Sequence, residues 1–221
     1  LDQRAHPVDL AALAHLVERA HLQRGGRGRG RWGRGRGWGW GVNRVVVVGT
    51  TGSGKTTLAR ALAQAYNLPH TSLDTLHWRP NWQPAPQEEF VRDVQATIGA
   101  DRWVMEGNYR AVREMIWERA DTIVWIDLPF TVNARQLFRR TWVDCRTGRP
   151  ICNGNQQRLW ELIKWPDGLW IWFFRTYFRR RRQYTAMRQE PRYAGKQWIH
   201  LTSPAATREF AARLNVSLET D

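Results

Sequence analysis

The hydrophobic pattern of the chain after residue 42 alternates between short apolar runs and longer amphipathic segments. The apolar runs predict strands at residues 44–48, 69–73, 102–106, 121–127 and 197–202. The amphipathic segments predict helices at residues 55–66, 86–98, 110–119, 131–143, 155–165, 168–189 and 204–214. Because apolar strands that alternate with helices are typical of a parallel sheet covered on both faces, the pattern predicts an α/β fold.

Residues 1–41 have a different pattern. Residues 7–22 are compatible with a short amphipathic helix, whereas residues 25–41 contain almost only Gly, Arg and Trp, a composition that cannot bury a core and predicts disorder. Three interpretations stay open: an arm that binds single-stranded nucleic acid through charge and stacking, a solvated tail, or upstream GC-rich DNA translated in frame. We therefore predict a disordered tail at residues 1–41 and one domain at residues 42–221.

The most specific motif follows the first predicted strand. Residues 49–56 read G-x-x-x-x-G-K-T, the phosphate-binding loop, between an apolar run and an amphipathic helix. Its glycines allow backbone N–H groups to surround a β-phosphate, Lys55 reaches the β- and γ-phosphates, and the Thr56 hydroxyl is suited to Mg²⁺. The motif therefore predicts that the chain binds ATP and Mg²⁺. The residues expected at the nucleotide are Gly49, Thr50, Thr51, Gly52, Ser53, Gly54, Lys55, Thr56 and Thr57.

Polar residues follow the second predicted strand, at the edge where ligands bind to parallel sheets. Asp74 is expected to orient or deprotonate an attacking hydroxyl group, or to hold Mg²⁺ through water, although a helix cap or turn is the structural alternative. His77 and Arg79, with Trp78 and Trp82, could form a pocket for the acceptor. Each tryptophan taken alone is more simply explained by packing.

The third and fourth predicted strands are also followed by polar residues. Glu106 is expected near the metal, and Arg110 could face a phosphate group on the acceptor. Arg135 and Arg139 are four residues apart in a predicted helix, so both could grip a nucleotide from one helical face and act in catalysis. A solvated basic face would explain the same arginines without a function.

The positive charge of the chain is concentrated in two segments. The chain has 34 basic and 20 acidic residues, and its formal net charge is +14. Residues 1–41 hold 8 arginines and 3 acids, and residues 135–192 hold 14 basic and 4 acidic residues. Aromatic residues interleave with the arginines at 173–184, so a nucleotide-dependent protein that binds DNA or RNA is a second hypothesis. A basic lid over a phosphate site explains the same charge.

The cysteines and the apolar runs of the sequence argue against a zinc-binding protein and against a membrane protein. Cys145 and Cys152 are the only cysteines and have no histidine nearby, so a four-ligand zinc site is not expected and we predict free thiols in a reducing compartment. The longest apolar run, at 169–174, has six residues, far fewer than the roughly 18 of a membrane helix. We therefore expect a cytoplasmic protein without a signal peptide or membrane span.

The ordered set of motifs resembles the bacterial DNA topology modulation proteins, which are similar to adenylate kinase and other P-loop nucleoside and nucleotide kinases. The resemblance extends from about residue 44 to 214 and is carried by the loop, L-D-T-L-H-W-R-P-N-W at 73–82, E-G-N-Y at 106–109, W-I-D-L-P at 125–129 and the arginine-rich segment. It implies a three-layer α/β/α fold with a five-stranded parallel sheet in the order 2-3-1-4-5. A mobile, arginine-rich helical lid would cover about residues 141–192.

The resemblance also implies roles for single residues. Residues 106–110 stand where adenylate kinase has D-G-F-P-R, which implies Glu106 in the Mg²⁺-water shell and Arg110 as a ligand of an acceptor phosphate. Arg135 and Arg139 stand at the two lid-hinge arginines, and residues 202–205 stand where adenine packs. The first hypothesis is therefore Mg²⁺-dependent transfer of the ATP γ-phosphoryl group to a small nucleotide- or nucleoside-like acceptor.

Overall fold

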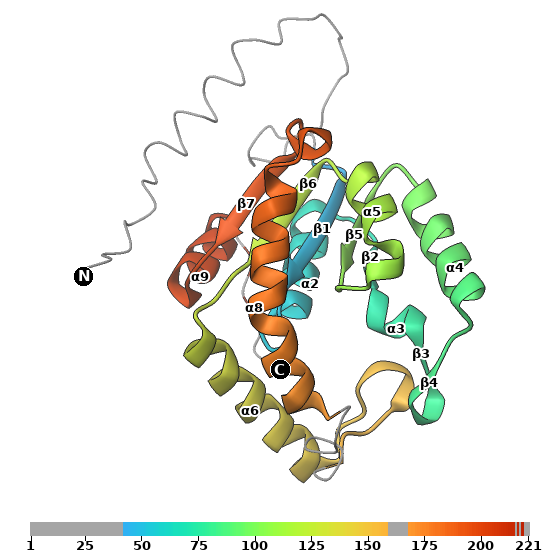
Figure 1. Cartoon of the computed structure of the whole chain (residues 1–221), viewed down its shortest axis with the longest axis vertical. Helices are drawn as coiled ribbons and strands as arrows, with labels where there is room; N and C mark the ends of the chain where they lie inside the picture. The colour runs from blue at the N-terminus through green and yellow to red at the C-terminus, as the bar shows by residue number, and fades with distance from the viewer. Residues whose placement is uncertain (1–41, 159–167, 215, 217, 219–221) are drawn as a thin grey trace, which may run out of the picture. The chain divides into compact units, whose positions relative to one another are not determined.

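A five-stranded parallel sheet lies at the centre of the computed structural model, which describes residues 42–158, 168–214, 216 and 218 (Figure 1). The strands are β1 (Arg44–Gly49), β2 (His70–Ser72), β5 (Trp103–Glu106), β6 (Thr122–Ile126) and β7 (Gln197–Leu201). Their order across the sheet is β2-β5-β1-β6-β7, and every pair is parallel. This is the predicted 2-3-1-4-5 order when the five strands are counted along the chain.

Helices cover both faces of the sheet. The first face packs against α2 (Lys55–Tyr66) and α9 (Pro204–Arg213), and the second packs against α4 (Gln87–Gly99), α5 (Arg110–Arg119) and the C-terminal half of α8 (Leu169–Arg188). The N-terminal half of α8 packs instead on α6 (Phe130–Thr147). The arrangement is a three-layer α/β/α fold of the P-loop type, as predicted.

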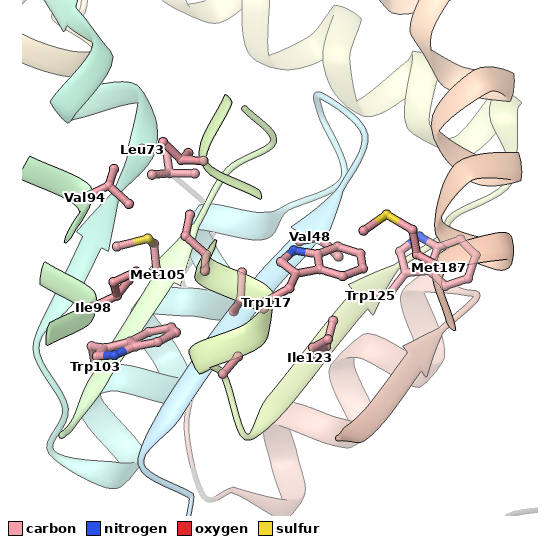
Figure 2. Close-up of a cluster of buried hydrophobic side chains, with 14 of the residues drawn as sticks. Val48, Leu73, Val94, Ile98, Trp103, Met105, Trp117, Ile123, Trp125 and Met187 are labelled. Carbon is pink, nitrogen blue, oxygen red and sulfur yellow. The ribbon is translucent and has the colours of Figure 1, made fainter. Parts of the chain in front are cut away.

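The alternation of side chains along β1 explains why both layers form. Val45 and Val47 lie in the cluster with α2, whereas Val46 and Val48 lie in the cluster with α4 and α5. Figure 2 shows the second cluster, in which Trp103, Trp117 and Trp125 fill the space between the sheet and its helices. Because β1, β5 and β6 have apolar side chains on both faces, their sequences are nearly continuous apolar runs.

Short elements after β2 differ from the prediction. The strand expected at residues 69–73 ends at Ser72, because α3 (Leu73–His77) begins at the next residue. The chain then forms a small antiparallel ribbon from β3 (Trp78–Arg79) and β4 (Gln83–Pro84), joined by a 3₁₀ turn at Pro80–Trp82. None of these elements reaches the length at which periodicity becomes readable.

The segment between β6 and β7 contains the predicted lid. Its described part contains α6, a 3₁₀ turn at Cys152–Gly154, α8 and a second 3₁₀ turn at Pro191–Tyr193. The helix predicted at 155–165 is wrong in its first part, because residues 155–158 are not helical, and the rest lies outside the described residues. The predicted tail at residues 1–41 also lies outside them. In the described part of the chain, no helix is both long enough and apolar enough to cross a membrane.

Candidate active site

A cleft of about 2440 Å³ opens at the carboxyl ends of the strands. Its wall combines the glycine-rich loop after β1, α3, the segment after β5, α6, α8 and the start of α9. Pockets for a single small ligand usually occupy about 300–1,000 Å³. The cleft is therefore large enough for two ligands beside one another.

Close contacts of the glycine-rich loop explain its glycines. Gly49 has a φ of 155°, and a Cβ atom there would lie 2.5 Å from the carbonyl oxygen of Ile126. Gly52 has a φ of 81°, and its Cβ atom would lie 2.8 Å from the Cβ atom of Leu137 in α6. Glycine is thus required at both positions for space as well as for conformation.

Polar groups of the loop are left without partners at the start of α2. Gly54 precedes the helix with a φ of 87°, no side chain caps the first turn, and that turn contains no acidic residue. The buried hydroxyl group of Ser53 has no hydrogen-bond partner among the described residues. Uncapped N–H groups at a helix start attract anions, so the loop fits the phosphate groups of a nucleotide.

Lys55 lies at the bottom of this anion site. Its ammonium group donates a hydrogen bond to the carbonyl oxygen of Thr50, with an N–O distance of 3.0 Å. Burial lowers the pKa of Lys55 to about 8, although the nearby carboxylates of Glu106 and Asp74 act in the opposite direction. Phosphate oxygens beside the ammonium group would raise this pKa again.

Glu106 ends β5 as a buried carboxylate and is only 1% exposed. Its Oε1 atom accepts hydrogen bonds from the hydroxyl groups of Thr56, at 3.0 Å, and Ser72, at 2.7 Å. Among the described residues no Lys or Arg forms an ion pair with it. A carboxylate and a hydroxyl group beside a phosphate site are hard oxygen donors, so this set fits Mg²⁺.

The side chains that could bind a metal ion in the cleft are few, which is usual for Mg²⁺ sites beside phosphate groups. Within the described ranges there is no group of three His, Cys, Asp or Glu side chains that could hold a metal ion. Mg²⁺ usually keeps several waters and binds one or two protein oxygens together with substrate phosphates. Thr56 and Glu106 fit this description, and the hydroxyl group of Ser72, which the sequence pattern did not indicate, donates a hydrogen bond to Glu106.

Asp74 lies on the cleft wall in the first turn of α3. Its Oδ1 atom accepts a hydrogen bond of 2.7 Å from the hydroxyl group of Tyr109. Burial, with the charge of Asp74 next in importance, holds the pKa of Tyr109 far above its usual value, so the phenol stays a donor. The alternative of a helix cap is not realised, because Ser72 occupies the N-cap position of α3 and no side chain caps that helix.

The other predicted site residues divide into two groups. Arg110 and Arg139 line the cleft, whereas His77, Arg79 and Arg135 do not. His77 packs against the rings of Trp78, Phe90 and Tyr109, and Arg79 forms an ion pair with Glu89. The pocket expected from His77 and Arg79 is therefore a packing cluster and a surface ion pair.

The rotation of α6 separates Arg135 from Arg139. The helix faces the cleft through Gln136, Arg139, Arg140, Val143 and Asp144. One helical residue corresponds to a rotation of about 100°, so Arg135 is turned away from the face defined by Gln136 and Arg140. The sequence spacing predicted both arginines on one face of the helix, but only Arg139 lines the cleft.

Two buried arginines in the cleft wall were not predicted as site residues. Arg113 of α5 is 9% exposed and Arg180 of α8 is 8% exposed. Arg113 is one of many arginines in amphipathic helices, and Arg180 stands within the run 179–182. Nothing in their sequence neighbourhood indicates burial, because that depends on which helices pack against them.

The loop after α6 is tied to the opposite wall of the cleft by asparagine side chains. The side-chain amide of Asn153 donates to the carbonyl oxygens of Thr75 and Trp78, at 2.8 and 2.6 Å. Asn155, which is buried, accepts from the Trp82 N–H group at 2.8 Å and donates to the Arg79 carbonyl at 3.0 Å. Residues far apart in sequence thus form one continuous rim.

No protein-family model and no curated protein sequence matches the chain. Similar solved structures include shikimate kinase from Acinetobacter baumannii, with 14% identity, coverage of 79% of this chain and 92% of that chain, and a TM-score of 0.46. A gluconokinase from Sinorhizobium meliloti 1021 has 20% identity, coverage of 78% and 91%, and a TM-score of 0.43. A sugar kinase from Janibacter sp. HTCC2649 has 18% identity, coverage of 81% and 99%, and a TM-score of 0.40. Identities and scores this low do not assign an activity to this chain.

Proposed function

We propose that the protein is a Mg²⁺-dependent phosphotransferase that moves the γ-phosphoryl group of ATP to a hydroxyl group of a small acceptor. The observation that supports this best is the presence of three features at one cleft, two of them in its lining and the third, Glu106, buried and joined to the lining by the hydrogen bond from Thr56. These features are an uncapped phosphate loop with Lys55, a buried carboxylate at Glu106 held by Thr56, and a separate carboxylate at Asp74. A protein that only binds nucleotide has no need for the third.

Each feature has a role at the nucleotide. The loop N–H groups and Lys55 hold the β- and γ-phosphates, and Thr56 and Glu106 hold the metal through oxygen atoms. Bound Mg²⁺ supplies charge neutralisation at the phosphate oxygens. Pro204 and Thr207, at the start of α9, line the end of the cleft nearest β7 and are suited to contact the adenine ring.

The acceptor reacts on the Asp74 side of the cleft. Its hydroxyl oxygen forms a bond to the γ-phosphorus while the bond from that phosphorus to the β,γ-bridging oxygen breaks, and ADP leaves. The hydroxyl proton passes to the carboxylate of Asp74, which the Tyr109 hydroxyl group orients. Arg139, on the cleft face of α6, offsets negative charge on the transferring group.

The resemblance to nucleoside and nucleotide kinases favours a nucleotide- or nucleoside-like acceptor. Arg110 lies in the cleft wall, where it is able to contact a phosphate group on such a molecule. Trp78 and Trp82 line the same region and offer flat apolar surfaces to a ring. The acceptor side therefore combines a cation with aromatic surfaces.

The test is Mg²⁺-dependent ATP consumption by the full chain, alone and with a panel of nucleotides, nucleosides and other small hydroxyl compounds. Transfer is identified by mass spectrometry of the phosphorylated acceptor, and Lys55→Ala is the inactive control. Stimulation by one acceptor class with a matching product supports the proposal. Slow hydrolysis that no acceptor stimulates would contradict it.

The nucleic-acid hypothesis has one specific feature in its favour. Phe174 and Phe178 of α8 are 54% and 56% exposed, so they could stack on bases. Phe173, Tyr177 and Tyr184 are buried and belong to the packing of the protein. Single-stranded and duplex DNA are included in the panel at about 50 mM salt, where nonspecific binding is strong.

A further inference from the structure

Two arginines in the cleft wall are buried without a counterion among the residues that the structure describes. Arg113 and Arg180 each expose less than a tenth of their surface, and among the described residues no carboxylate forms an ion pair with either. The Nε atom of Arg113 and the Nη1 atom of Arg180 are buried and have no hydrogen-bond partner in the described part of the chain. Unpaired buried charge is costly, so such groups in a cleft point to a missing anion.

We propose that Arg113 and Arg180 form a subsite for an anionic group, a carboxylate or a phosphate, of the acceptor. The inference rests on the proposed phosphotransfer and narrows its substrate class to acceptors that already carry a negative charge. The arginines bind this group and position the acceptor, while the hydroxyl group that reacts lies nearer Asp74.

Neutral groups fix the two guanidinium groups in place. Arg180 lies 4.2 Å above the ring of Trp172, and its Nη2 atom donates to the carbonyl oxygen of Asn108 at 3.4 Å. Arg113 lies 5.8 Å from the centre of the Tyr184 ring. Rings and carbonyl groups orient arginine without consuming its charge, which stays available for a ligand.

The electrostatics of the pair agree with this geometry. Burial lowers the pKa of Arg180, and the positive charge of Arg113 adds to that effect. Tyr184 and, to a smaller extent, the carboxylate of Asp74 shift this pKa in the opposite direction. A bound anion would offset the repulsion between the two arginines, and this gain favours binding of an anion between them.

Asn108 connects the subsite to the phosphate loop. Its side-chain amide donates to the carbonyl oxygen of Gly49, and its Oδ1 atom accepts from the Tyr184 hydroxyl group at 2.6 Å. Its backbone carbonyl is the group that receives Arg180. The anion subsite is therefore coupled through one residue to the loop that holds the nucleotide.

Strand order places the subsite on the acceptor side. Arg113 belongs to the helix after β5, and β5 lies between β1, which leads into the phosphate loop, and β2, which leads into Asp74. The start of α9, proposed above to contact adenine, follows β7 at the opposite edge of the sheet. An anion at Arg113 thus lies on the same side of the phosphate loop as Asp74, away from the start of α9.

The test compares the variants Arg113→Met and Arg180→Met with the control variant Arg182→Met. Arg182 lies in α8, like Arg180, but it is exposed and does not line the cleft. With the acceptor found in the panel, each cleft variant should raise the KM for acceptor by about 10- to 100-fold, with little change in the KM for ATP. Arg182→Met should behave as the wild type. Paired acceptors that differ only in carrying a phosphate or a carboxylate distinguish the two anions.

Thermal unfolding separates a binding role from a structural one. Methionine keeps much of the side-chain volume and removes the unpaired charge, so Arg113→Met should keep or raise the Tm of the free protein. A lowered Tm with unchanged KM for acceptor would make these arginines structural and overturn the inference. An equal rise in the KM for ATP would place them on the triphosphate and also overturn it.

A second measurement is independent of turnover. Inorganic phosphate is added to protein saturated with Mg²⁺ and a non-hydrolysable ATP analogue, and the rise in Tm is recorded. We expect this rise in the wild type and in Arg182→Met but not in Arg113→Met. If no acceptor is phosphorylated but this difference is found, the proposed function fails and the anion subsite stands. An identical rise in all three proteins would refute the subsite.

Discussion

Gly52 and Gly54 allow a measurement of how tightly the phosphate loop is packed. Both have positive φ angles, 81° and 87°, so alanine at either position meets the same left-handed backbone cost of about 1–2 kcal/mol. They differ in space: a Cβ atom on Gly52 would lie 2.8 Å from the Cβ atom of Leu137, whereas one on Gly54 has nothing within 4 Å.

The contact with Leu137 adds an overpacking cost of roughly 1–3 kcal/mol. Gly54→Ala should therefore lower the free energy of unfolding by about 1–2 kcal/mol, and Gly52→Ala by about 2–5 kcal/mol. For a domain of this size, each kcal/mol corresponds to a decrease in Tm of about 2–4 °C.

Urea unfolding followed by tryptophan fluorescence measures both variants against Gly99→Ala. Gly99 has no positive φ and no atom within 4 Å of its Cβ position, so alanine there should be neutral or slightly stabilising. Equal losses for Gly52→Ala and Gly54→Ala would refute the close approach of α6 to the loop.

Three further predictions concern the site. Burial lowers the pKa of Lys55 to about 8 and bound phosphates raise it, so nucleotide binding should take up a proton, and the affinity should fall about tenfold between pH 7 and pH 9. Calorimetry without Mg²⁺, in two buffers of different ionisation enthalpy, measures the affinity and the proton uptake. An affinity that stays constant over this pH range would contradict the prediction. Asp74→Asn should lower kcat by about 10²- to 10⁴-fold with little effect on nucleotide binding, whereas an unchanged kcat would remove Asp74 from the reaction. Asn155→Ala removes the acceptor of the Trp82 backbone N–H group and should lower the free energy of unfolding by about 1–3 kcal/mol. Hydrogen exchange at residues 78–84 should become faster. Asn153→Ala, which changes an exposed side chain, is the control and should have a smaller effect.

The core of the fold was predictable because its signals are local and strong. Strands with both faces covered must be apolar throughout, so β1, β5 and β6 stand out in the sequence. The loop after β1 needs glycines wherever backbone atoms approach closely. The strand order followed from the resemblance, and the pairings of the sheet confirm it.

Local signals failed where an element is short or where its meaning depends on a distant neighbour. The residues after Ser72 turn into α3 rather than extend β2, and five residues give too little periodicity to decide between them. His77 is a packing residue because Phe90 of α4 and Tyr109 surround it, which no local pattern indicates.

The sequence alone indicated the phosphate loop, a carboxylate that ends β5 (Glu106), a carboxylate shortly after β2 (Asp74) and a basic segment after β6. Only the tertiary structure decided which cations face the cleft, because every arginine in an amphipathic helix has the same local chemistry. The rotation of α6 turns Arg135 away, and α5 packs against α8 so that Arg113 and Arg180 are buried without a counterion among the described residues. The burial of an arginine and its lack of a partner depend on residues that are distant in the sequence, so these two arginines could be recognised only from the tertiary structure.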